Sequence, residues 1–339
     1  MMMKYVHLVL LNVFILFSSC STGEASAAAA AKILGGSSQA PVFLNCKAVS
    51  EDELEFEFSR LVKVVSLNLD PHLAVASIEN GETVKVKFEK NPGPGMPFTA
   101  DLVAEDEDGN TINVLIPFKT RNPRMPKLVI NELCTEYSKP RTEFIEFKMK
   151  TAGNLGGMRV FFAGNSKLDF YEFQPVEVKA GDYVVLHLRT VEEGCKDETS
   201  AKLNASGGKN SSPEARDFWI PGNAKKLHKA NSIVYVLDQD DKVLASIMVA
   251  EKSDLPWGKE HLAEAANFLF TQNAWKSSDG KTCRPADAVS SAGTTATRTI
   301  CRNEKAANTN AAADWYITVS SGLTPGKPNN EKRYQKSPN

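Results

Sequence analysis

Apolar residues at every second position constrain the fold of this chain more than any other feature. Over residues 53–58 three apolar side chains alternate with three glutamates, and residues 83–88 repeat the pattern with Thr and Lys. A β-strand sends successive side chains to opposite faces, so the pattern predicts strands with one buried face and one solvated face. Further strands are expected at 42–46, 62–69, 98–104 and 112–118. About seven short strands predict an immunoglobulin-like β-sandwich over residues 41–121.

The chain of 339 residues is long enough for two domains. Residues 122–126 read Asn-Pro-Arg-Met-Pro, and each proline keeps the residue before it out of the helical conformation, which predicts an extended linker. Alternating apolar segments resume after the linker, with a hairpin expected from 233–237 and 243–249. We therefore predict an all-β protein with two immunoglobulin-like β-sandwiches in tandem, the second over residues 127–330, followed by a tail over 331–339.

The second domain carries short motifs in a fixed order. They are a strand ending in Asn-Glu, a strand with glutamates around an aromatic residue, a Leu-x-Gly turn, a Gly-x-Tyr-x-Val-Leu strand, and the closing sequences Thr-Arg-Thr, Asp-Trp and Thr-Pro-Gly-Lys-Pro-Asn. The motif residues are Asn131, Glu132, Glu143, Glu146, Gly157, Tyr183, Arg298, Asp314, Trp315, Pro325, Gly326 and Asn329. In this order, residues 127–330 resemble the lamin tail domain. The resemblance implies a compact immunoglobulin-like β-sandwich, in which these residues are structural, of a kind found on exported and membrane-attached bacterial proteins.

Two insertions extend the second domain. Residues 195–215 are rich in Gly, Ser, Lys and Asn, which predicts a mobile loop. Residues 254–275 are expected to be helical, because Leu262, Leu269 and Phe270 recur at three- and four-residue steps with alanines between them. Ser253 or Asp254 is a candidate helix cap. The helix should pack on the sandwich through Leu262 and Phe270.

The N-terminus predicts export. Lys4 precedes an apolar run over residues 6–17, and about 12 apolar residues are too few to span a bilayer as a helix. The sequence from Leu16 to Cys20 resembles a bacterial lipobox, which implies a signal peptide over 1–19 and a lipidated flexible tether over 20–40. A signal peptide cleaved without lipidation is the alternative. We expect the protein to be exported and lipid-anchored to the cell envelope, at the outer membrane or cell surface.

Five cysteines follow Cys20, and an odd number outside the cytoplasm leaves at least one free thiol or an intermolecular bond. Sequence proximity suggests a disulfide between Cys283 and Cys301, and a weaker case exists for Cys134 with Cys195. No Cys-x-x-Cys or Cys/His spacing suits zinc. We therefore predict neither a metal site nor a cofactor.

Glu132, Glu143 and Glu146 come from neighbouring predicted strands and are the first candidates for metal binding or acid–base chemistry. In a regular strand Glu143 and Glu146 face opposite sides, so these two cannot converge. We expect structural hydrogen bonds or an ion pair with Arg298, since a buried acid needs a partner. The acidic stretches 106–110 and 238–241 do not match the spacing of a calcium loop and are expected to be hairpin turns.

Four tryptophans could offer a surface for stacking on a sugar or a base. Trp315 is expected in the core, and Trp257 and Trp275 are expected to pin the ends of the helix. Trp219, in the insertion, is therefore the candidate for ligand contact. His187 alternates with leucines on a strand and is expected to face solvent or to lie at the edge of the core.

Composition and motifs limit the function. With 40 basic and 41 acidic residues the net charge is −1, and no basic stripe supports nucleic-acid binding. No GxSxG, HExxH or Walker-type sequence occurs. We expect a non-enzymatic binding or structural module that contacts the membrane through its lipid and binds a protein or a polysaccharide. The alternatives are an exported hydrolase, of nuclease or phosphatase type with the second domain as accessory, and a stalk that binds no ligand.

Overall fold

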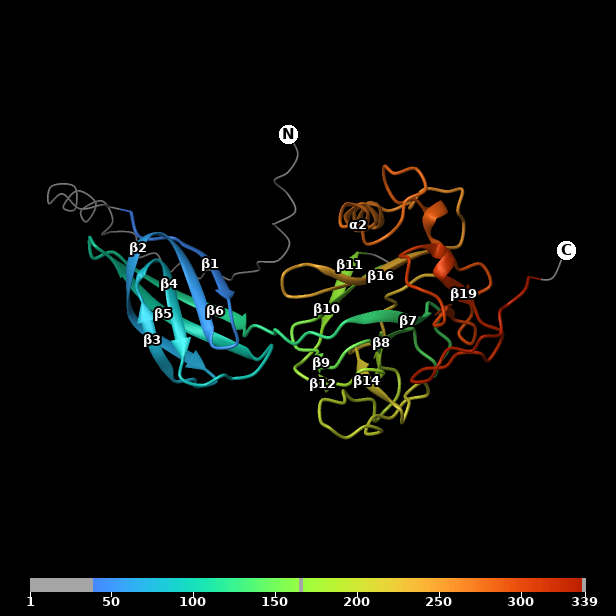
Figure 1. Ribbon diagram of the computed structural model, residues 1–339, viewed down its shortest axis with the longest axis horizontal. Helices are drawn as coiled ribbons and strands as arrows, with labels where there is room; N and C mark the ends of the chain where they lie inside the picture. The colour runs from blue at the N-terminus through green and yellow to red at the C-terminus, as the bar shows by residue number, and fades with distance from the viewer. Residues whose placement is uncertain (1–38, 165–166, 337–339) are drawn as a thin grey trace.

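The computed structural model describes residues 39–164 and 167–336. Cys20, the predicted signal peptide over 1–19 and nearly all of the tether over 20–40 lie outside these residues. The described chain forms two β-domains that lie side by side and are joined by one extended connector (Figure 1). No helix in the described ranges is long and apolar enough to span a membrane.

The first domain is one sheet that folds over on itself. Its strands are β1 (Phe43–Ala48), β2 (Glu53–Asp70), β3 (Val75–Glu79), β4 (Gly81–Phe88), β5 (Pro97–Asp106) and β6 (Thr111–Lys119). The order is β3-β4-β2-β5-β6, with β1 also paired to β2. The first half of β2 pairs with β1 and β4, and its second half pairs with β5. The folded sheet has two layers, and β2 is part of both. The buried side chains of the alternating pattern fill the space between the layers.

The structure corrects one detail of the predicted first domain. The stretches expected as separate strands at 53–58 and 62–69 form a single strand of 18 residues, β2. Its pairing with β4 shifts register between Glu57 and Val62, and its pairing with β5 shifts between Val64 and Ser66. Such irregularities bend and twist a strand, which allows β2 to pass from one layer to the other.

The second domain is a two-layer sandwich. Its strands are β7 (Leu128–Cys134), β8 (Phe144–Met149), β9 (Gly153–Asn154), β10 (Arg159–Ala163), β11 (Leu168–Glu172), β12 (Glu177–Val178), β13 (Tyr183–His187), β14 (Ala215–Trp219), β15 (Asn231–Leu237), β16 (Val243–Ala250), β17 (Val289–Ser290), β18 (Ile300–Arg302) and β19 (Trp315–Ile317). One layer has the order β11-β10-β15-β16-β17 and the other has the order β14-β13-β8-β7-β18-β19. The predicted hairpin is formed by β15 and β16. Short 3-10 helices, Pro285–Asp287 and Ala312–Asp314, precede β17 and β19.

Strand β7 is buried at all seven positions, which shows that its sheet is covered on both faces. The inner face packs in the core. The outer face of the sheet is covered by the segment 195–214, through Ser206 on Trp219, and by the C-terminal segment, through Thr324 on Glu132. The prediction of a mobile loop at 195–215 is therefore corrected, because Glu198, Ser206, Asn210 and Ser212 are all buried. Glu198 accepts hydrogen bonds from the backbone N–H groups of Ala205, Ser206 and Asp217, which fixes the segment.

The predicted helix is present but shorter than expected. Helix α2 spans Glu260–Thr271 and buries Leu262, Ala265, Ala266 and Leu269. Its N-cap is Lys259, without a side-chain capping bond, so neither Ser253 nor Asp254 caps it. The helix packs on β10, β15 and β16, where Phe268 contacts the ring of Tyr235. Trp257 and Trp275 flank it and donate ring N–H groups to backbone carbonyls, as expected for residues that pin its ends.

Both predicted disulfides are wrong for this structure. The described cysteines, Cys46, Cys134, Cys195, Cys283 and Cys301, all have free thiols. The thiols point to separate partners: Cys283 lies 3.7 Å from the Trp275 carbonyl, and Cys134 lies 3.3 Å from the Glu136 carbonyl. A disulfide requires two cysteine side chains that are close in space and point toward each other. Closeness in sequence does not determine where the side chains point.

Candidate functional site: the cleft between the two domains

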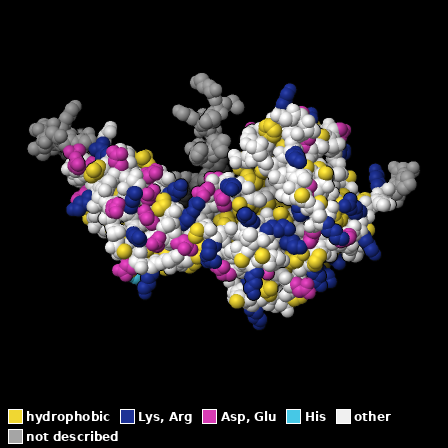
Figure 2. All heavy atoms as spheres, viewed as in Figure 1, with side chains coloured by type: hydrophobic (Ala, Val, Ile, Leu, Met, Phe, Trp, Pro, Cys, Tyr) yellow, Lys and Arg dark blue, Asp and Glu magenta, His cyan; other side chains and the backbone are white. Residues whose placement is uncertain are grey.

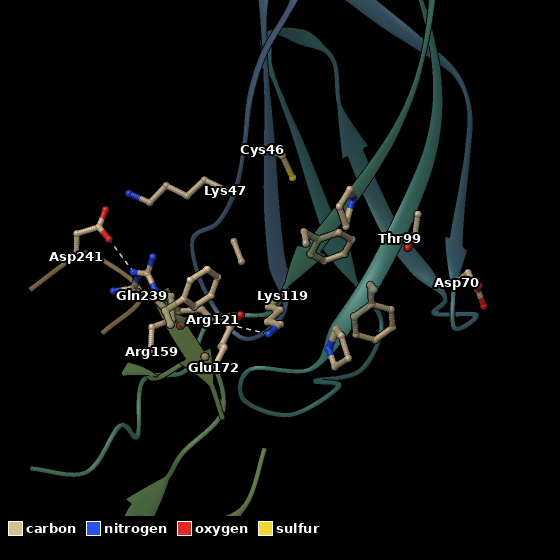
Figure 3. Close-up of a pocket in the computed structure, with 17 residues that line it drawn as sticks. Cys46, Lys47, Asp70, Thr99, Lys119, Arg121, Arg159, Glu172, Gln239 and Asp241 are labelled. Carbon is tan, nitrogen blue, oxygen red and sulfur yellow. Dashed lines mark hydrogen bonds and ion pairs between the residues drawn. The ribbon is translucent and has the colours of Figure 1, made fainter. Parts of the chain in front are cut away.

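A cleft of about 590 Å³ lies where the two domains meet. The first domain contributes residues of β1, β5 and β6 and the end of β2, and the second contributes β10, β11 and the turn between β15 and β16 (Figure 3). Its volume falls within the range of about 300–1,000 Å³ typical of small-ligand sites. Neither domain forms the cleft alone, so its geometry depends on how the domains are held together.

Ion pairs connect the domains along one wall of the cleft. Lys119 at the end of β6 lies 2.7 Å from Glu172 of β11, and Arg121 forms a two-pronged ion pair with Asp240. Hydrogen bonding between Arg121 and Asp240 lowers the pKa of the carboxyl and raises that of the guanidinium. The domains differ in charge: residues 41–126 hold 9 basic and 14 acidic residues (−5), and residues 127–336 hold 29 and 26 (+3). Acidic and basic side chains meet at the junction (Figure 2).

The acidic turn at 238–241 is hydrogen-bonded to the chain that connects the two domains. Gln239 accepts a hydrogen bond from the Asn122 N–H at 2.7 Å and donates one to the Thr120 carbonyl at 3.0 Å. The prediction of a hairpin turn is correct, because Asp238 caps the turn by accepting bonds from the N–H groups of Asp240 and Lys242. The same turn also holds the first domain in place, which the sequence did not indicate.

Two glycines let the domains approach closely. Gly95 has φ of +66°, and a Cβ at this position would lie 2.6 Å from the carbonyl carbon of Gly156. Gly156 in turn lies against the Pro94 carbonyl, at 3.0 Å from the position of its own Cβ. A side chain on Gly95 would therefore push the second domain away.

Aromatic side chains supply the apolar surface of the cleft. Phe98 and Phe118 stack with ring centroids 5.6 Å apart, and Phe170 stacks on Phe161 at 5.3 Å. Phe170 keeps 44% of its surface exposed and so presents apolar surface to the cleft. Cys46 also lines the cleft, but burial raises the pKa of its thiol to about 12. It therefore stays protonated and is a poor nucleophile.

The charges of the cleft largely cancel. Arg159, like Lys119 and Arg121, is paired: its guanidinium lies 2.7 Å from Asp241. Outside these ion pairs the lining holds one more cation, Lys47, and one more acid, Asp70. The arrangement offers apolar surface framed by balanced polar groups, which suits an uncharged ligand with an apolar face.

The carboxyl groups singled out from the sequence lie elsewhere, on the outer face of the β7–β8 sheet. Glu132 and Glu146 are opposite each other in the register of β7 and β8, and both are fully buried. Burial raises the pKa of Glu132 to about 7, and burial and the charge of Glu132 raise the pKa of Glu146 well above its usual range. At pH 7 Glu132 is therefore only partly ionised, and Glu146 is shifted toward its protonated form.

A third carboxyl group, Glu304, completes this cluster and was not identified from the sequence. Asn131 donates to both Glu146 and Glu304, at 2.8 and 3.0 Å. Burial acts to raise the pKa of Glu304, but a 2.6 Å hydrogen bond from Lys148 and bonds from two asparagines hold it below its usual value. Lys148 in turn lies 5.0 Å from the ring centroid of Tyr183.

The C-terminal segment Thr324–Asn329 closes over these carboxyl groups. Glu132 accepts bonds from the N–H and the hydroxyl of Thr324, and Glu146 accepts one from the N–H of Gly326 at 2.6 Å. Asn329 donates to the carbonyls of Asn131 and Arg302. The expectation of structural hydrogen bonds is thus correct for Glu132 and Glu146.

The predicted ion pair with Arg298 is wrong. Glu143 is fully buried and pairs with Arg189, which the sequence analysis did not consider. Arg298 instead places its guanidinium 4.4 Å from the ring centroid of Tyr334. The register of β8 against β13 brings Arg189, two residues past His187, to the end of β8 where Glu143 lies.

Trp219 is not an exposed ligand contact. Its side chain is 5% exposed, its ring N–H donates to Ser206 Oγ, and it stacks on His187 with centroids 3.7 Å apart. His187 is fully buried and does not face solvent, since its Nε2 lies 2.7 Å from Asp217 Oδ1. The exposed aromatic residue that the sequence analysis sought is Phe170.

The remaining motif residues have local roles. Gly157, at φ of +80°, lies against the Gln239 side chain, and Asp314 accepts two bonds from Thr309. Trp315 is half-buried rather than enclosed, and Pro325 lies in the C-terminal closing segment. The structure therefore gathers Asn131, Glu132, Glu146, Tyr183, Pro325, Gly326 and Asn329, and leaves Glu143, Gly157, Arg298, Asp314 and Trp315 apart from them. Among the described residues, no three His, Cys, Asp or Glu side chains are placed to hold a metal ion.

The sequence analysis missed the cleft because it treated the domains separately. A five-residue linker was the available signal, since so short a connector forces the facing ends of two domains into contact. Oppositely charged residues near that linker, such as Arg121 and Asp240, were then candidates for pairing.

Together, the fold and the cleft define a two-domain all-β protein whose second domain is a sandwich closed by its own C-terminal segment. The chain belongs to the family described as "TP_1001_2nd: protein second domain", which matches residues 126–317. It is also similar to an uncharacterized protein of Treponema pallidum (strain Nichols), with 27% identity over 201 residues, 57% of this chain. The matched part spans 51% of that protein, about half its length.

Comparison with solved structures gives weaker similarities. The N-terminal part of the bacterial S-layer protein SbsC matches with a TM-score of 0.24 and 13% identity, covering 67% of this chain and 47% of that one. The chicken CNTN1 FN1-FN3 domains match with a TM-score of 0.16 and 11% identity, covering 65% and 69%. At these scores neither similarity carries an argument about this protein.

Proposed function

We propose that this protein is a non-enzymatic binding module, held at a cell envelope by a lipid on Cys20, that binds its ligand in the cleft between its domains. The cleft itself carries the proposal. It combines exposed aromatic surface with polar groups, and both domains are needed to build it. Binding sites that lie between domains are common, because two rigid bodies together form a deeper concavity than one.

The ligand we propose is an uncharged segment of an envelope polysaccharide or protein. Phe170 offers a flat apolar face, and neighbouring side chains such as Thr99 offer hydrogen-bonding groups. The candidate acid–base residues support binding over hydrolysis, since Glu132, Glu143 and Glu146 are fully buried away from the cleft and hydrogen-bonded within the domain. We also propose kinship of the second domain with the lamin tail domain, supported by seven of its motif residues that lie together, four on the sheet and three in the closing segment.

The binding proposal is tested with Phe170→Ala and a matched control, Leu115→Ala. Leu115 is another exposed apolar residue, 68% exposed on β6, and does not line the cleft. Envelope material is separated into neutral polysaccharide and protein fractions, and the retention of each on immobilised wild-type and variant proteins is measured. We expect Phe170→Ala to weaken retention of one fraction by about tenfold. Equal retention by the two variants would overturn the proposal.

Attachment is tested separately with Cys20→Ser. If Cys20 carries the lipid, this variant moves from the membrane fraction to the soluble fraction, and mass spectrometry finds acyl chains on the wild-type N-terminal peptide alone. An unmodified wild-type Cys20 would contradict the anchor without affecting the cleft.

A further inference from the structure

A second groove, of about 400 Å³, lies at the far end of the second domain from the first. It runs between the edge strands β17 and β19 and is lined by Val289, Trp315, Ile317 and Tyr334, among others. Trp315 and Tyr334 are half-buried, so each presents part of a flat apolar ring to solvent. Such rings contact the apolar face of a ligand while polar atoms at its edges remain available.

The position of Tyr334 is well defined. Its backbone N–H donates to the Ile317 carbonyl at 2.8 Å, and its ring packs on Gly293, where a Cβ would lie 2.4 Å from a ring carbon. Glycine at 293, with φ of +111°, thus makes room for the ring. The ring is part of the wall of the groove and is held there by the backbone.

Three basic side chains lie around this groove, and none of them forms an ion pair with a carboxylate among the described residues. Arg298 stacks on Tyr334 with its guanidinium carbon 4.4 Å from the ring centroid, and Arg333 stacks on Tyr316 at 4.8 Å. Lys336 lines the groove directly. Basic side chains also gather around the C-terminal end of this domain (Figure 2).

The neighbouring acids do not neutralise these cations. Asp287 and Asp314 are buried and accept backbone N–H bonds, Asp287 from Ser278 and Arg284 and Asp314 from Thr309. The exposed Glu331 is paired with Lys305. The groove therefore differs from the interdomain cleft, in which cations are matched by acids.

From these observations we infer that the groove binds an acidic polysaccharide, with a sugar ring against Trp315 and uronate carboxylates on Arg333, Lys336 and Arg298, which Tyr334 holds in place. A guanidinium stacked on a ring leaves its N–H edge free for a two-pronged bond to a carboxylate. An added peptide strand is disfavoured, because the end of β19 is already paired through the Thr318–Arg333 bridge. Three clustered cations are too few for the run of phosphates in a nucleic acid.

The test uses the mature chain carrying Cys20→Ser, with a short oligogalacturonate as probe and a maltooligosaccharide of equal length as neutral control. Titration is followed by calorimetry and by tryptophan fluorescence. We expect binding of the oligogalacturonate that weakens with added salt, and no measurable binding of the neutral control. Arg298→Gln with Arg333→Gln, and separately Tyr334→Ala, should each weaken binding by about tenfold or more.

Two further variants keep the result interpretable. Lys336→Gln changes an exposed residue and leaves the fold intact, and it should weaken binding by a few-fold. Lys202→Gln, which removes an exposed cation outside the groove lining, should leave binding unchanged. The inference is overturned if the oligogalacturonate does not bind, if the groove variants bind like Lys202→Gln, or if polyglutamate or single-stranded DNA binds as tightly with the same sensitivity to the variants.

Discussion

Glu132 and Glu146 lie directly across from each other on β7 and β8 with no exposed surface on either side chain. Two carboxyl groups in this position cannot both ionise without cost, because neither has water to screen its charge. Burial accordingly shifts both groups toward the protonated form, with the pKa of Glu132 raised to about 7, while hydrogen bonds from Lys148 and two asparagines lower the pKa of Glu304.

The first prediction concerns pH. In the unfolded chain both groups titrate near 4.5, whereas in the folded protein burial raises the pKa of Glu132 to about 7 and that of Glu146 well above 4.5. The folded state thus binds more protons above pH 4.5, and this stabilisation, complete below 4.5, is lost as pH rises through about 7. We expect the Tm of the second domain to fall between pH 5 and pH 8, measured by calorimetry.

Glu132→Gln is the informative variant, since it removes a titrating group and keeps the side-chain shape. The fall of Tm with pH should be smaller than in the wild type, whereas Glu107→Gln, an exposed residue on a turn, should behave as wild type. His228 and His261, whose pKa values are lowered by burial, also make Tm depend on pH. Their contribution is the same in variant and wild type, so it cancels when the two Tm curves are subtracted. Parallel curves for Glu132→Gln and wild type would contradict the assignment.

A second prediction concerns the buried pair of Glu143 and Arg189. Arg189→Met leaves Glu143 enclosed without its partner and should lower the free energy of unfolding by about 3–5 kcal/mol. Arg124→Met breaks the pair with Glu177, whose side chains are 51% and 60% exposed, and should cost less than about 1 kcal/mol. Urea unfolding of both variants gives the comparison, and equal losses would disprove the role of Arg189.

The third prediction tests how closely the domains pack. Gly95→Val places a side chain against the backbone of Gly156 and should separate the domains, which small-angle X-ray scattering detects as a larger radius of gyration. Gly109→Val is the matched control: Gly109 also has a positive φ, +77°, but its Cβ would meet nothing within 4 Å. Both variants strain a turn, and Gly95→Val alone should change the dimensions of the molecule.

A fourth prediction concerns the thiols. In denaturant without reductant, Cys20→Ser protein should react with a thiol reagent at all five remaining cysteines. In the native state Cys134, Cys283 and Cys301 are buried, so their reaction should be much slower than that of the half-buried Cys195. A count of three or one in denaturant would establish one or two disulfides instead.

The alternating pattern predicted the sandwich class because burial of one face is a local property of a strand. The bend in β2 was not predictable in this way, since it depends on which strands pair with each half. The helix was placed correctly by Leu262 and Leu269, but its length was overestimated: both flanking tryptophans lie outside the helix, although their ring N–H groups fix the chain there.

Pairing between distant residues explains most of the remaining differences. Arg189 and Glu143 are 46 positions apart, and Glu304 and Lys148 are 156 apart. Which distant residues pair depends on where strands end and how they are aligned in the sheet. A single sequence does not show that alignment. Trp219 was misassigned for the same reason: it is the last residue of β14, a strand of the sheet, and the segment 195–214 packs against it.

The closing segment has a consequence for biosynthesis. Glu132 belongs to the first strand of the second domain, yet its hydrogen bonds from Thr324 come from a residue 192 positions later. During synthesis the strands of this domain leave the ribosome long before residues 324–329, which cover the outer face of β7 and β8, are made. The two facing carboxyl groups consequently remain open to water until those residues emerge, and the domain reaches its final packing only then.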